Sequence, residues 1–222
     1  MASAKTTAYE QLRLRLLSGQ YPPGTQLKEE PLGRELGLSR TPIRAALKML
    51  VDDGLATAEG SQGIHVADWS ADDIDEMFQI RSLLEPYAVK RAVERGGAAL
   101  VNVLRACNAR MSEGIRVGGA QAMAQVQEAN QSFHRALLDA CGPSRIRTIL
   151  LGVASNPVII RGFYLYSPEE LAQSLHHHED LTLAAEAGDG ELAQQVMQLH
   201  IRMAYKRFSS RRASFLQLSE SQ

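Results

Sequence analysis

Four side chains in the second half of the chain have the chemistry of metal ligands. Asn130 and His134 lie four residues apart, so they share one face of a predicted helix. His178 and His200 lie on two later predicted helices. Neutral imidazoles from separate helices can converge on one divalent ion, and three nitrogens with one oxygen leave room for water or a ligand. Spacing alone leaves two alternatives open: each histidine could be an ordinary buried polar group, and either of the two histidines just before His178 could face inward instead.

A helix with a basic face is predicted in the first quarter of the chain, after a tight turn at residues 36–39. Its apolar residues recur at helical spacing and predict a buried stripe of Ile43, Ala46, Leu47 and Leu50. Its basic residues recur on another face: Arg40, Arg44 and Lys48. In the turn, Gly37 can adopt the left-handed conformation that ends one helix, and Ser39 can cap the next. The segment therefore predicts a helix-turn-helix.

The surroundings of this basic face favour DNA binding over a merely solvated surface. No acidic residue occurs between Glu35 and Asp52, and the polar Ser39 and Thr41 lie at the start of the helix. Such a helix fits the major groove, where its N-terminal residues meet base edges and its basic residues meet guanine or phosphate. Lys48 extends the same face.

A short hairpin is predicted directly after this helix. Residues 55–58 and 64–66 are partly β-branched runs, which indicates two short strands. The tip between them contains Gly60, Ser61 and Gln62, which lack bulk and could approach a phosphate or the minor groove. An ordinary surface hairpin is the alternative interpretation.

The run LGLSRTPIRAAL over residues 36–47, followed by Asp53-Gly54-Leu55, resembles the winged helix of GntR-type bacterial transcription regulators. The preceding segment also fits, with a helix over 9–17, a linking turn over 19–27 and a second helix from about residue 29. The resemblance implies double-stranded operator DNA as a partner. It also implies DNA contacts from the wing tip and from Ser39, Arg40, Thr41 and Arg44. Glu30 is a departure, since some relatives carry a DNA-contacting arginine there.

The length of 222 residues suits two domains, because a winged helix of about 68 residues leaves about 150 for a second core. We predict a DNA-binding domain over 1–68 and an effector-binding and dimerisation domain over 69–222. The net charge is only −1, but residues 1–50 carry eight basic and four acidic side chains, a net charge of +4. A basic end on a near-neutral chain confines affinity for nucleic acid to that end.

Export and membrane signals are not evident in the sequence. The first residues lead into an amphipathic helix, unlike a signal peptide, and no apolar run approaches the ~18 residues of a membrane span. Cys107 and Cys141 form neither a CxxC motif nor a zinc-ribbon spacing, so we expect small core residues in a reducing compartment. These observations predict a cytoplasmic protein with no membrane partner.

Helical periodicity replaces the strand signals after residue 69. Residues 70–73 have the pattern of a capping box that opens a helix. Glycines then separate further candidate helices over 98–112, 120–140, 144–154, 168–187 and 190–210. The fold class expected is mainly α, with a winged helix and its small β-hairpin followed by an all-α helical bundle.

The second part is similar to the FCD domain, the C-terminal module of FadR-type GntR regulators, across about residues 70–210. The similarity rests on the residues around His134 and on the spacing of His178, Gly188-Asp189 and His200. It selects His178 over His176 and His177. It implies a site for a divalent transition metal, with zinc, nickel and manganese as candidates, formed by Asn130, His134, His178 and His200. Asn130 departs from the aspartate more usual in the family, which removes a charge and should weaken metal binding.

Two arginines of the second part suggest an acidic effector. Arg81 and Glu85 lie one helical turn apart, so a local ion pair is the simple interpretation. An arginine that points into an apolar bundle would need an anion, and members of the family often use a similarly placed arginine for a carboxylate. Arg161, with Tyr164 nearby, is the second candidate. A small organic acid is the effector class that we expect.

These features predict a ligand-responsive transcription regulator without enzymatic activity. We expect it to bind an inverted-repeat operator as a homodimer, since one winged helix reads only a few base pairs. A metal-dependent hydrolase with a fused DNA-binding domain is the alternative, because three histidines and a water also form a catalytic pattern. Glu128 and Asp139 share a candidate helix with His134, but no motif marks either as a general base. An architectural DNA binder would leave the helical part unexplained.

Overall fold

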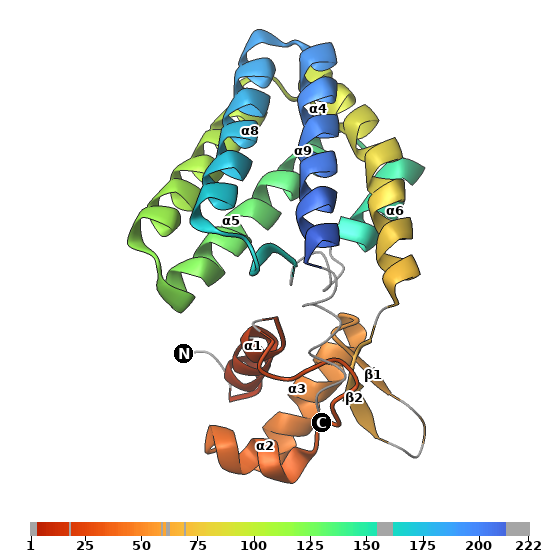
Figure 1. The fold of residues 1–222 in the computed structure, drawn as a ribbon, viewed down its shortest axis with the longest axis vertical. Helices are drawn as coiled ribbons and strands as arrows, with labels where there is room; N and C mark the ends of the chain where they lie inside the picture. The colour runs from red at the N-terminus through yellow and green to blue at the C-terminus, as the bar shows by residue number, and fades with distance from the viewer. Residues whose placement is uncertain are drawn as a thin grey trace. The chain divides into compact units, whose positions relative to one another are not determined.

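The computed structural model describes residues 4–17, 19–58, 60, 63–68, 70–154 and 162–211. These residues form two compact units, one that ends at Ser70 and one that begins at Ala71 (Figure 1). Each unit is described by itself below.

The first unit is a winged helix. Its helices are α1 (Ala4–Leu17), α2 (Glu29–Leu36) and α3 (Arg40–Asp52). Its hairpin pairs β1 (Ala56–Ala58) with β2 (Ile64–Val66) in antiparallel orientation, with Ala56 opposite Val66. α1 contacts α3, and the whole predicted apolar stripe of α3 is buried. The predicted helix-turn-helix with a small wing is confirmed.

The turn between α2 and α3 depends on a glycine, as predicted. Gly37 has a left-handed φ of 66° and donates its N–H to the Arg34 carbonyl, which ends α2. Ser39 has the extended conformation of an N-cap residue. Its side chain makes no capping hydrogen bond, so the predicted cap is right in position and wrong in bonding.

The second unit is an all-α bundle. Its helices are α4 (Ala71–Val117), α5 (Gly119–Ala140), α6 (Arg145–Ala154), α8 (Pro168–Ala187) and α9 (Gly190–Ser210) (Figure 1). α4 packs against each of the other four. The helix expected over 98–112 begins as predicted, after a break at Gly97, where non-helical φ of 52° and ψ of −154° separate the two helical parts of α4. The second part runs on to Val117, beyond the predicted end.

Well-defined caps position α8 and α9, which carry two of the predicted ligands. Ser167 and Glu170 form a reciprocal capping box at the start of α8. Gly188 ends α8 with a left-handed φ of 66°, and the Asp189 carboxylate accepts a hydrogen bond from the Leu192 N–H at the start of α9. The tight turn makes α8 and α9 antiparallel neighbours, which contact each other. Within the described ranges, no helix has both the length and the apolar character needed to cross a membrane.

Candidate metal centre and nucleic-acid interface

Three histidines from three helices meet in the core of the bundle. His134 comes from α5, His178 from α8 and His200 from α9, and each offers a ligand atom within 4.8 Å of the others. Their ring centroids lie 5.1–5.3 Å apart, and all three residues are buried. The helices therefore bring together nitrogen donors that are separated by as many as 66 positions in the chain.

Several polar atoms of these histidines and of Asn130 have no hydrogen-bond partner in the part of the chain that the structure describes. They are both ring nitrogens of His178, Nδ1 of His200 and Oδ1 of Asn130. Asn130 lies one helical turn before His134 on α5. Buried polar atoms are almost always hydrogen-bonded, so a group of buried donors and acceptors without partners calls for a ligand. The chemistry of this set, imidazole nitrogen and amide oxygen, fits a divalent transition metal.

A buried ion pair orients the first of these histidines. His134 Nδ1 lies 2.8 Å from Glu85 Oε1, and Arg81 Nε donates to Glu85 Oε2 at 2.8 Å. Burial alone would raise the pKa of Glu85, but the Arg81 charge and the His134 hydrogen bond lower it to about 2. The ionised carboxylate favours the His134 tautomer with the proton on Nδ1, which leaves the Nε2 lone pair for a metal. The predicted Arg81–Glu85 pair exists, whereas its link to His134 was not predicted.

The other two rings are held in the neutral form that a metal requires. Burial, followed by the charges of neighbouring groups, lowers the pKa of His178 and of His200 well below the ordinary value of 6.5. The His178 ring is stacked on Phe133 at a centroid distance of 4.0 Å, which fixes its plane. His176, by contrast, is exposed and has its Nδ1 3.0 Å from Glu179 Oε2.

The predicted effector residues lie in different surroundings. Arg81 is buried against Glu85 and has its guanidinium 5.7 Å from the centroid of the Phe78 ring. Tyr164 is half-buried in the short turn before α8. Arg161 lies outside the described residues.

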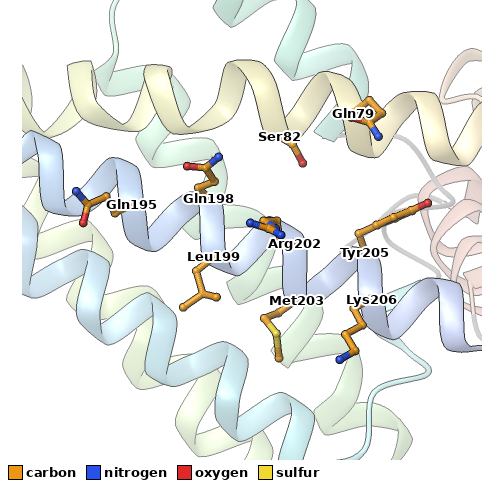
Figure 2. A pocket seen from close by; sticks show the side chains of 9 residues that line it. All are labelled: Gln79, Ser82, Gln195, Gln198, Leu199, Arg202, Met203, Tyr205 and Lys206. Atoms are coloured by element: carbon orange, nitrogen blue, oxygen red, sulfur yellow. The ribbon is translucent and has the colours of Figure 1, made fainter.

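A groove on the outer side of the bundle contains none of the predicted effector or metal residues. Side chains of α4 and α9 line it, and several of them are polar or basic, as Figure 2 shows: Gln79, Ser82, Gln195, Gln198, Arg202 and Lys206. Most of these side chains are exposed, so the groove is open to solvent. The histidines of the candidate metal site lie in the interior of the bundle instead.

In the first unit, α3 presents its basic face to solvent. Ser39, Arg40, Thr41, Arg44 and Lys48 are all exposed, whereas the apolar stripe is buried. The predicted DNA contacts are thus available on one helix. Among the predicted wing contacts, Gly60 is exposed, and Ser61 and Gln62 lie outside the described residues.

An acidic side chain of α2 engages this basic face. Glu29 Oε1 lies 2.6 Å from Arg44 Nε, and Glu29 Oε2 lies 3.3 Å from Arg40 Nε. The hydrogen bond from Arg44, with the two positive charges, lowers the pKa of Glu29. The sequence shows no acid in α3 before Asp52, but it could not show that α2 supplies one to the basic face. DNA phosphates would compete with this carboxylate for both arginines.

Comparisons with known proteins give the class of this molecule. The family described as bacterial regulatory proteins, gntR family, matches residues 4–66, and the FCD domain matches residues 76–203. The HTH-type transcriptional repressor GlaR of Escherichia coli (strain K12) is 27% identical over 216 residues, which cover 90% of this chain and 94% of that protein. The uncharacterized HTH-type transcriptional regulator YdhC of Bacillus subtilis (strain 168) is 29% identical over 142 residues. That match covers 64% of this chain and 62%, less than two thirds, of the Bacillus protein.

A solved structure agrees with this assignment. E. coli McbR/YncC has a similar fold, with a TM-score of 0.66 and 25% sequence identity over 94% of this chain and 100% of that chain. The fold is that of a DNA-binding transcription regulator with a winged helix and a helical bundle. The chain belongs to the GntR family of bacterial regulatory proteins, in the group with a C-terminal FCD domain.

Proposed function

We propose that this protein is a metal-dependent sensor of a small organic acid, which controls transcription from the cytoplasm by changing its affinity for an operator. The observation that carries the proposal is the cluster of His134, His178 and His200, whose ligand atoms all lie within 4.8 Å of one another. Asn130 Oδ1, which has no hydrogen-bond partner among the described residues, is the proposed oxygen ligand of the set. Zinc, nickel and manganese each accept ligands of this kind. A bound metal would supply positive charge and open positions for a carboxylate.

Operator binding is proposed to involve two copies of the chain. Ser39, Arg40, Thr41 and Arg44 cover only a few base pairs, together with a wing tip that includes Gly60, Ser61 and Gln62. Two linked half-sites raise affinity without new kinds of contact, and closed two-fold symmetry is the commonest form of a homo-oligomer. We therefore propose a homodimer on an inverted-repeat operator.

Coupling between acid and operator is proposed to pass through α4. His134, His178 and His200 come from α5, α8 and α9, so shared ligation joins three helices. The chain His134–Glu85–Arg81 extends this connection to α4, the helix that follows the wing in sequence. An acid changes operator affinity only through its different affinities for two arrangements of these helices. A tenfold change in operator binding requires about 1.4 kcal/mol of such coupling.

The two candidate bases of the hydrolase alternative are engaged in ion pairs elsewhere. Glu128 forms an exposed ion pair with Arg110 at 3.1 Å, and Asp139 forms exposed ion pairs with Arg135 and Arg147. A general base must come within hydrogen-bond reach of the proton that it removes. Glu85 is near, but its carboxylate already binds Arg81 and His134.

The proposed function is tested by operator binding under controlled metal and acid. The DNA upstream of the protein's own gene is titrated with metal-loaded and chelator-treated protein, with and without a panel of di- and tricarboxylic acids. We expect at least one acid to change operator affinity about tenfold, and chelation to abolish that change. Turnover of an acid, or operator affinity that no combination alters, would contradict the proposal.

The identity of residue 130 gives a prediction with a defined sign. Asn130→Asp is expected to tighten metal binding, because a carboxylate adds negative charge to the ligands of a divalent cation. Metal dissociation constants from competition with a chromophoric chelator measure the effect. Asn108→Asp is the matched control. It changes a half-buried amide on α4 that donates a hydrogen bond to Thr182 and is not in the proposed ligand set. Equal or weaker metal binding by Asn130→Asp would remove residue 130 from the ligand set.

A further inference from the structure

A buried arginine on α9 has no role in the proposed metal centre. Arg207 is only 6% exposed. Its Nη2 donates to Gln173 Oε1 on α8, and its guanidinium carbon lies 5.0 Å from the centroid of the Tyr166 ring. Its Nη1 has no hydrogen-bond partner in the described part of the chain. One edge of this guanidinium group is therefore available inside the bundle.

The charge of Arg207 is uncompensated by the buried residues that the structure describes. Among the described buried residues other than histidines, the ionised side chains are Arg81, Glu85 and Arg207. Arg81 and Glu85 neutralise each other through their hydrogen-bonded ion pair. Against the effect of burial, the charge of Arg207 is one of several interactions that lower the pKa of Glu170. The Glu170 carboxylate, however, forms an ion pair with Arg211 at 2.8 Å. Burying an unpaired charge costs free energy, so a bound anion next to Arg207 would stabilise the folded protein.

Two more polar atoms of α8 have no hydrogen-bond partner among the residues that the structure describes. They are Ser174 Oγ and His177 Nδ1, and both residues are buried. Gln173, Ser174 and His177 fall within one turn of α8, and Gln173 contacts Arg207 directly. The His177 ring lies 5.6 Å from the His200 ring. Polar groups thus continue from the histidine cluster toward Arg207.

We infer that Arg207 binds one carboxylate of the effector, with Ser174 and His177 as further polar contacts. The effector is therefore a short dicarboxylate or tricarboxylate, with a second carboxylate at the histidine cluster. His200 and Arg207 are separated by seven residues, about 10 Å of helix rise, and the arginine side chain leans back toward the helix N-terminus. With a metal bound at the histidine cluster, a monocarboxylate would leave one of two positive regions uncompensated. This inference rests on the proposed acid sensing and names the residue that selects the acid.

The test measures thermal stabilisation of the full-length protein by defined acids. Succinate, malate and citrate are the probes, and succinamate, in which an amide replaces one carboxylate of succinate, is the paired control ligand. We expect one or more probes to raise the Tm of the wild type by several degrees, and succinamate to raise it far less. Arg207→Gln should lose this shift and keep its metal content. Arg202→Gln, which removes an exposed arginine of the outer groove on the same helix (Figure 2), should behave as the wild type.

The outcomes separate this inference from the proposed metal function. If chelated protein keeps a shift that depends on Arg207, the metal part of the proposed function fails and the assignment of Arg207 stands. If metal-loaded protein shows equal shifts in the wild type and Arg207→Gln, or no probe stabilises the wild type, the assignment of Arg207 fails. Should Arg207→Gln not fold, Arg207→Lys and Ser174→Ala take its place, and unchanged shifts in both overturn the inference.

Discussion

Replacement of His200 by alanine is expected to remove the metal from the purified protein and to abolish the response of operator binding to acids. His200 lies close to two other imidazoles in the buried core, so its loss leaves only two nitrogen donors and one amide oxygen in the proposed ligand set. Loss of an outer-shell partner typically costs about 10- to 100-fold in metal affinity, and loss of a direct ligand should cost more. His134→Ala should have the same effect and should also deprive Glu85 of one partner.

The readouts are metal content per protomer and operator affinity, measured on the same preparations. Operator binding without effector should stay within about twofold of the wild type, because the predicted DNA contacts lie in the other unit. His176→Ala is the matched control, since this histidine is on α8 but exposed and paired with Glu179. Full metal content in both His134→Ala and His200→Ala would show that these rings are ordinary core residues.

Local sequence patterns predicted the elements of this fold well. The helical spacing of apolar residues identified α3 and its buried stripe, and Gly37 and Gly188 end helices in the left-handed conformation expected of glycine. The glycines at 96–97 also mark a real break, since Gly97 has a non-helical φ of 52° and ψ of −154° between the two helical parts of α4. The pattern missed the length of the second part, which continues to Val117, because the extent of a helix depends on what it packs against.

The candidate sites were predictable only in part. Spacing and family resemblance named the histidines that meet in the core, because each occupies the inward face of its own helix. The partners that come from other helices could not be inferred in this way. Glu85 reaches His134 across 49 positions, and Glu29 reaches Arg44 across 15. Helical periodicity indicates which face of a helix is buried, but the neighbour of that face depends on tertiary packing.

Replacement of Arg44 by alanine is expected to weaken operator binding by a factor between several-fold and about a hundredfold. It should also reduce the discrimination between bases at one base pair. Arg44 is exposed on the recognition helix, and its guanidinium has the planar fork that pairs with guanine O6 and N7. In the free protein Glu29 accepts from Arg44 Nε at 2.6 Å and from Nη2 at 2.9 Å. This exposed pair is readily exchanged for a DNA contact, because ion pairs in water contribute little.

Lys48→Ala provides the contrast within the same prediction. A lysine that meets phosphate carries no sequence information, so its loss should weaken binding to operator and scrambled DNA alike and lower the salt slope by about one unit. Titrations on both DNAs at several salt concentrations separate the two roles. Arg105→Ala, which removes an exposed arginine of the bundle that pairs with Glu186, controls for the change in net charge. Unchanged operator binding by both Arg44→Ala and Lys48→Ala would show that α3 is not the recognition helix.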